Sequence, residues 1–155
     1  MRSAIIFLAS AAYVGYIPVA SGTFGSLVAM PLYWLLDDLR QQSPTLYVVT
    51  FVALVLAACW IAGKAEELLH EHDSHKIVID EVIGYFAAML FLEPTWSHAV
   101  AAFFIFRALD VVKPYPANYI DADFPGGWGV TLDDVVSGLY SNLVLRLLIA
   151  VGLPL

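Results

Sequence analysis

Two adjacent carboxylates, Asp80 and Glu81, lie within the stretch IVIDEVIGYF, which is otherwise apolar. An ionised carboxylate in a low-dielectric setting costs several kcal/mol unless a cation or a set of hydrogen bonds compensates its charge. The pattern therefore indicates either a bound cation or a position at a wet edge of the fold.

A second acidic pair, Asp133 and Asp134, follows a glycine-rich turn in GGWGVTLDDVVSG. Two apolar residues follow each pair, and a glycine, Gly84 or Gly138, lies within one helical turn after the pair. The repeated pattern predicts two helices that bring carboxylates to a shared point, with the glycines allowing close backbone approach. Carboxylate oxygens from several helices suit a hard divalent cation such as Mg2+.

Basic side chains accompany a further carboxylate in FRALDVVKPYP, where Arg107, Asp110 and Lys113 recur at intervals of three. A helix presents side chains with this spacing along roughly one side, and Pro114 and Pro116 then end the helix. An arginine and a lysine beside a metal site suit an anion, most simply a phosphate. Asp110 is either a further metal ligand or the base that orients water.

The stretch SGTFGS, residues 21–26, supplies small residues, hydroxyls and backbone N–H groups just before an apolar run that begins at Leu27. A helix start of this kind can hold an anion. We therefore expect Thr23, Gly25 and Ser26 to contribute to phosphate binding, with an ordinary helix N-cap and flexible glycines as the alternative.

The composition indicates an integral membrane protein. The chain has 155 residues, of which 61% are hydrophobic and 14% charged, whereas a typical soluble domain carries about 25% charged residues. Its net charge of −7 argues against a nucleic-acid partner. The lone cysteine, Cys59, excludes an intramolecular disulfide.

We expect one domain, residues 1–155, folded as an all-α polytopic membrane helical bundle. The segment at about 46–63 approaches the ~20 apolar residues that a spanning helix needs. Several other runs are shorter, so some helices must tilt, pair as re-entrant halves or begin deep in the membrane. The apolar runs lie at about 4–20, 27–36, 46–63, 82–92, 98–112 and 135–151. The sequence leaves open whether the first run, at about 4–20, spans the membrane, lies on it or is a signal peptide.

The order of these runs predicts which polar segments share a side of the membrane. Counting each run from residue 27 onward as one crossing places residues 21–26, 64–81 and 107–134 on the same face. Most of the lysine and arginine residues lie on that face, which the positive-inside rule makes cytoplasmic. We therefore expect three distant segments to meet in one site on the cytoplasmic side.

Two other acidic or histidine-rich segments do not match the sites that their residue types suggest. HEHDSH, residues 70–75, has a histidine spacing that fits no common zinc site, which favours a solvated loop. DAD, residues 121–123, is not preceded by the strand that aspartyl-phosphate phosphatases place there.

Taken in order and spacing, SGTFGS, HDSHKIVIDEVIG, FRALDVVKPYP and GGWGVTLDDVVSG resemble the motifs of the phosphatidylglycerophosphatase A family, lipid phosphatases of the bacterial inner membrane. The resemblance covers residues 17–145. It implies Mg2+-dependent removal of the terminal phosphate from phosphatidylglycerophosphate to give phosphatidylglycerol in phospholipid biosynthesis, at an active site that faces the cytoplasm.

The resemblance implies the substrate, whereas the residues themselves lead us to assign a metal set and a phosphate-binding pair. The metal set is Asp80, Glu81, Asp133 and Asp134, and the phosphate-binding pair is Arg107 and Lys113. Attack by an activated water and an aspartyl-phosphate intermediate both remain open as routes. The number of metal ions, the oligomeric state and the lipid entry path are also open.

A small cation transporter or channel that uses the same carboxylates is the alternative function. A cation pathway has no need for Arg107 and Lys113 beside the acids, because they would repel the ion.

Overall fold

The computed structural model describes residues 2–153, and this part of the chain is helical and contains no strand. The all-α prediction is therefore confirmed. Within residues 2–153, seven α-helices and one short 3-10 helix follow in the order α1 (Arg2–Ala9), η1 (Val14–Tyr16), α2 (Ser21–Gln42), α3 (Pro44–Leu69), α4 (Ile79–Ala88), α5 (Trp96–Val112), α6 (Ala117–Asp123) and α7 (Gly127–Ala150).

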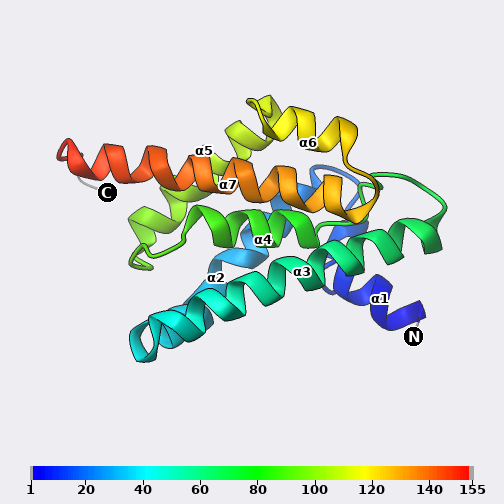
Figure 1. Cartoon of the computed structure of the whole chain (residues 1–155), viewed down its shortest axis with the longest axis horizontal. Coiled ribbons are helices and arrows are strands. Elements are labelled where there is room, and N and C mark those ends of the chain that lie inside the picture. The colour runs from blue at the N-terminus through cyan, green and yellow to red at the C-terminus, as the bar shows by residue number, and fades with distance from the viewer. Residues whose placement is uncertain (1, 154–155) are drawn as a thin grey trace.

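The short helix α4 lies at the centre of the bundle, between α7 and α3 (Figure 1). Eight of its ten residues are buried. Tyr85 and Phe86 join a core that includes Tyr33 of α2 and Phe106 of α5. Because the whole helix is enclosed, the acidic residue Asp80 in its first turn is buried with it.

Two glycines allow α4 and α7 to pack in close contact. A Cβ atom added to Gly138 would lie 2.1 Å from the carbonyl oxygen of Gly84. A Cβ atom added to Gly84 would lie 2.5 Å from the ring of Phe106 and 2.9 Å from the carbonyl oxygen of Asp134. The predicted close approach at these glycines is confirmed, and it brings the two acidic pairs together.

The predicted span at 46–63 lies inside α3, a helix of 26 residues. At 1.5 Å per residue such a helix is about 39 Å long. Among the described residues, α3 alone is long and apolar enough to cross a membrane. Its start is well defined because the Ser43 side chain accepts a hydrogen bond from the backbone N–H of Leu46 at 3.3 Å, and Pro44 occupies the first helical position.

Membrane crossing by the other runs stays a prediction. Helix α4 has ten residues and α5 has 17, and both fall short of the ~20 residues that span a bilayer.

The first apolar run, residues 4–20, does not form one continuous helix. Helix α1 ends at Ala9, and Ala11, Ala12 and Tyr13 then adopt positive φ angles of 45°, 59° and 69°. Ala9 accepts a hydrogen bond at 2.9 Å from the backbone N–H of Val78, just before α4. The run turns back because it packs against the chain that leads into α4.

Helix α2 begins at Ser21, earlier than the apolar run from Leu27 indicates, so SGTFGS forms its first turns. The Ser21 hydroxyl donates a hydrogen bond to the carbonyl oxygen of His75 at 2.6 Å. A Cβ atom added to Gly25 would lie 2.9 Å from Cβ of Val78. The small residues therefore serve helix packing against the segment before α4, a tertiary contact that helix propensity does not reveal.

Candidate active site

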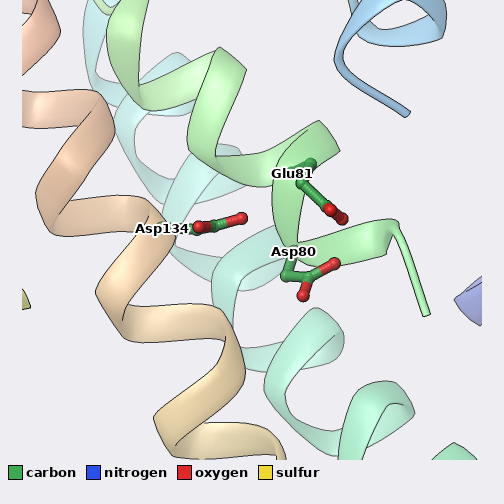
Figure 2. Close-up of side chains that lie close together, drawn as sticks. All are labelled: Asp80, Glu81 and Asp134. Carbon is green, nitrogen blue, oxygen red and sulfur yellow. The ribbon is translucent and has the colours of Figure 1, made fainter. Parts of the chain in front are cut away.

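Carboxylates from three helices converge at one end of α4. Asp134 extends from α7 towards Asp80 and Glu81 in the first turn of α4 (Figure 2). One oxygen of each of these three residues lies within 4.8 Å of the others. Asp110, Asp133 and Asp134 form a second group with the same spacing, so Asp134 belongs to both.

These carboxylates are withdrawn from solvent and incompletely paired. Asp80, Asp133 and Asp134 are 6%, 1% and 3% exposed. Oδ1 of Asp80, Oδ1 of Asp133 and Oε2 of Glu81 have no hydrogen-bond partner among the described residues. Buried polar atoms normally have partners, so these oxygens are available to a ligand. An all-oxygen donor set of this kind fits a hard divalent cation.

Burial leaves the site with unfavourable negative charge. Burial and the neighbouring Glu81 raise the pKa of Asp80, and burial and Asp110 raise the pKa of Asp134. Burial also raises the pKa of Asp133 to about 6, despite its contact with Lys113. A bound cation would lower these pKa values again because it favours the ionised carboxylates.

Metal-free protein is therefore expected to be more stable at pH 5 than at pH 7.5. The raised pKa values mean that the folded protein binds more protons than the unfolded chain between about pH 4, the ordinary pKa of Asp, and the folded-state pKa values, so stability falls as pH rises through this window. One such group contributes roughly 1.4 kcal/mol for each pH unit that separates its folded-state pKa from its unfolded-state pKa. Thermal unfolding in detergent with EDTA measures this, and added Mg2+ should stabilise the protein more at pH 7.5. Stability that rises with pH in EDTA would contradict the account.

Two cations flank the acids. Nη1 of Arg107 lies 2.7 Å from Oδ2 of Asp110, one turn along α5. Lys113 caps the C-terminus of α5 in the left-handed conformation, and its Nζ contacts Asp133 at 2.6 Å and Asp121 at 2.9 Å. Burial alone would lower the pKa of Lys113, but these two carboxylates outweigh that effect and raise it.

A cavity of about 220 Å³ lies between the carboxylates and Lys113. The volume is several times that of one water molecule, about 30 Å³, and is sufficient for a phosphate group beside a cation. Its lining comes from α4, α5, α6, α7 and the loop before α4, namely Asp73, Asp80, Glu81, Asp110, Val111, Lys113, Asp121, Val130, Asp133 and Asp134. Polar groups from the second and third predicted segments thus meet in one place.

The first predicted segment, residues 21–26, reaches the site through Gly22. A Cβ atom added to Gly22 would lie 2.0 Å from Oε1 of Glu81 and 3.3 Å from Nη1 of Arg107. Ser26 is buried and donates a hydrogen bond to the carbonyl oxygen of Gly22 at 3.1 Å, while Gly25 packs on Val78. The phosphate-binding role of Thr23, Gly25 and Ser26 stays a prediction.

Asp73 and Asp121 also line the cavity, although neither is among the site residues that the sequence predicts. Asp121 lies on α6, which places its carboxylate in contact with Lys113. Asp73 lies in the loop before α4, next to His72. Closeness in sequence to predicted site residues is the feature that could have indicated them. Asp73 lies seven residues before Asp80, and Asp121 lies eight residues after Lys113.

Comparison with known proteins places this site in a class. The family model for phosphatidylglycerophosphatase A matches residues 7–149. Over 133 residues the chain is 37% identical to phosphatidylglycerophosphatase A of Escherichia coli (strain K12), and the match covers 84% of this chain and 75% of that protein. Over 131 residues it is 31% identical to phosphatidylglycerophosphatase A of Haemophilus influenzae, covering 84% and 79%.

A third relative has a different name. Over 138 residues the chain is 34% identical to a putative phosphatidylinositol-3-phosphatase of Bacteroides thetaiotaomicron, and the match covers 84% of each chain. No solved structure matches the chain.

The acidic cavity with its flanking arginine and lysine, together with these relatives, defines a lipid phosphatase, an enzyme that hydrolyses phosphoric monoesters. The chain belongs to the phosphatidylglycerophosphatase A family.

Proposed function

We propose that this protein removes the terminal phosphate of phosphatidylglycerophosphate to give phosphatidylglycerol, with Mg2+ as cofactor, at the cytoplasmic face of the bacterial inner membrane. The observation that carries the proposal is the two clusters of carboxylates that share Asp134 and line one cavity with Lys113, while Arg107 pairs with Asp110 beside them. The family supports the choice of lipid, and the apolar helix α3 supports membrane association.

The two clusters of carboxylates would supply the ligands for Mg2+. Asp80, Glu81 and Asp134 would hold an ion on the α4 side, and Asp133 with Asp134 would contribute on the α5 side, with Asp110 either a ligand or a base. When bound, Mg2+ neutralises charge on the phosphate and on the developing transition state and makes water a better nucleophile.

The chain's own residues then position the phosphate and its attacker. Lys113 and Arg107 donate hydrogen bonds to the phosphate oxygens, and the phosphate replaces part of their present pairing with Asp133 and Asp110. In the water route, Asp110 accepts a proton as the water oxygen bonds to phosphorus and the bond from phosphorus to the glycerol oxygen breaks. The departing glycerol oxygen takes up a proton from solvent water, and Asp110 returns the proton that it accepted to solvent. An aspartyl-phosphate on one of the carboxylates is the competing route.

Phosphate release by the purified protein in detergent micelles tests this function. With Mg2+ we expect release from phosphatidylglycerophosphate, with less from phosphatidic acid or phosphatidylinositol 3-phosphate, and excess EDTA should stop it. Folded protein that releases phosphate from none of these lipids would contradict the proposal. Cation flux in liposomes would then be the next measurement, because it tests a transport use of the same carboxylates.

A further inference from the structure

Glu66, in the last turns of α3, is a buried carboxylate outside the acidic groups described above. It is 9% exposed. Its Oε1 lies 2.5 Å from Nδ1 of His72 and accepts a hydrogen bond from the backbone N–H of Asp73 at 2.8 Å. One buried oxygen therefore fastens the loop before α4 to α3 at Asp73.

The loop is fixed at further points. The Ser21 hydroxyl donates to the carbonyl oxygen of His75 at 2.6 Å, and the N–H of Ile77 donates to the carbonyl oxygen of Ser74 at 2.8 Å. Asp73 itself has a φ of 48°, a left-handed conformation that aspartate tolerates better than most residues. With its backbone held on both sides, Asp73 is placed at the exposed rim of the acidic cavity.

Asp73 differs from the other acids of the cavity in its surroundings. Asp110 pairs with Arg107, and Asp121 and Asp133 pair with Lys113. Asp73 has no such cation partner among the described residues and belongs to neither candidate metal group. An ionised carboxylate only accepts hydrogen bonds. It would repel a phosphate but bind a hydroxyl group, so the rim position suits a part of the substrate that carries a hydroxyl.

We propose that Asp73, positioned by Glu66, determines substrate specificity by accepting a hydrogen bond from the free hydroxyl of the lipid headgroup. The inference rests on the proposed function. The glycerol headgroup of phosphatidylglycerophosphate carries a phosphodiester at one end, the terminal phosphate at the other and a single free hydroxyl between them. In the proposed binding mode the terminal phosphate lies at Lys113 and Arg107, and the hydroxyl reaches Asp73, an exposed residue of the same cavity lining.

The test compares phosphatidylglycerophosphate with an analogue that lacks only this hydroxyl. For the wild-type protein, kcat/KM should favour the natural lipid by about tenfold, the effect of one hydrogen bond to a charged group. Asp73→Gly tolerates the positive φ and removes the carboxylate, and it should hydrolyse both lipids at similar kcat/KM, close to the wild-type value for the analogue. Asp73→Asn retains an acceptor oxygen and should keep part of the preference.

Variants of Glu66 test whether this residue positions Asp73 or only stabilises the folded protein. Glu66→Ala frees the loop and should lose the preference for the hydroxyl as Asp73→Gly does, with retained activity on the analogue. Glu66→Gln keeps a carbonyl oxygen that accepts from the Asp73 N–H and should restore the preference. The matched control is Glu67→Ala, because Glu67 is exposed and pairs with Lys64 at 2.7 Å on the surface. It should retain the wild-type preference.

The outcomes separate the two proposals. A wild-type protein that hydrolyses both lipids equally well, or an Asp73→Gly variant that loses activity on both by the same factor, overturns the role of Asp73 and leaves the phosphatase function standing. A folded wild-type protein that hydrolyses neither lipid overturns the proposed function and the role of Asp73 with it.

Discussion

Asp134→Asn is expected to abolish phosphate release while the protein stays folded. Asp134 is 3% exposed and is the one carboxylate that both candidate metal groups share. Its replacement weakens both groups at nearly constant shape. The loss should exceed the roughly 10- to 100-fold that removal of an outer-shell partner costs in metal sites. Because asparagine cannot ionise in this buried position, metal-free Asp134→Asn should be at least as stable as metal-free wild type.

Asp38→Asn is the matched control. Asp38 is an exposed carboxylate on α2 that does not line the acidic cavity, so this variant should keep its activity. Phosphate release and thermal unfolding are measured on both variants. Near-normal turnover by Asp134→Asn would remove Asp134 from the metal set and the shared-ligand arrangement with it.

Gly138→Ala should have the second-largest effect, through the spacing of α4 and α7. The added Cβ would lie 2.1 Å from the backbone oxygen of Gly84, which cannot move without its helix. Separation of the helices displaces Asp134 from Asp80 and Glu81. Overpacking of this kind costs about 1–3 kcal/mol of stability, and a misplacement of about 1 Å in a catalytic site can cost about 100-fold in rate. Activity and the thermal midpoint should therefore both fall.

Gly63→Ala provides the comparison, since Gly63 also lies between packed helices. Its added Cβ would be 3.4 Å from the backbone nitrogen of Gly127, an ordinary contact. Alanine is also the better helix former by about 0.5–1 kcal/mol. This variant should therefore keep both stability and activity. If Gly138→Ala matched it in both measurements, the spacing of α4 and α7 would not control the site.

The acidic pairs and their glycines could be predicted because their chemistry and local spacing agree. Burial of an ionised Asp80 or Asp134 carries a large desolvation penalty unless a ligand compensates the charge. Gly84 and Gly138 each follow an acidic pair by about one helical turn. The long apolar helix that contains residues 46–63 could likewise be predicted from composition. These features depend on short stretches of chain, so no knowledge of tertiary contacts was needed.

The remaining parts of the site depend on contacts between distant segments. Gly22 lies at Glu81 only because α2 begins at Ser21 and packs against the segment before α4. Glycine and serine are weak helix formers, so local propensity placed this helix start later. Asp121 reaches Lys113 because α6 turns back on α7, and Asp73 reaches the rim because Glu66 holds its loop. None of these contacts leaves a periodic pattern in the sequence.

Metal binding and turnover measured in the same samples test the central claim most directly. Metal-free wild-type protein and Asp134→Asn are titrated with Mn2+, a spectroscopic substitute for Mg2+, and bound metal is followed by electron paramagnetic resonance while phosphate release from phosphatidylglycerophosphate is recorded. We predict that release rises with bound metal in the wild type and that Asp134→Asn loses both. Full release by metal-free wild type, or unchanged metal binding by Asp134→Asn, would contradict a metal-dependent site built on the shared carboxylate.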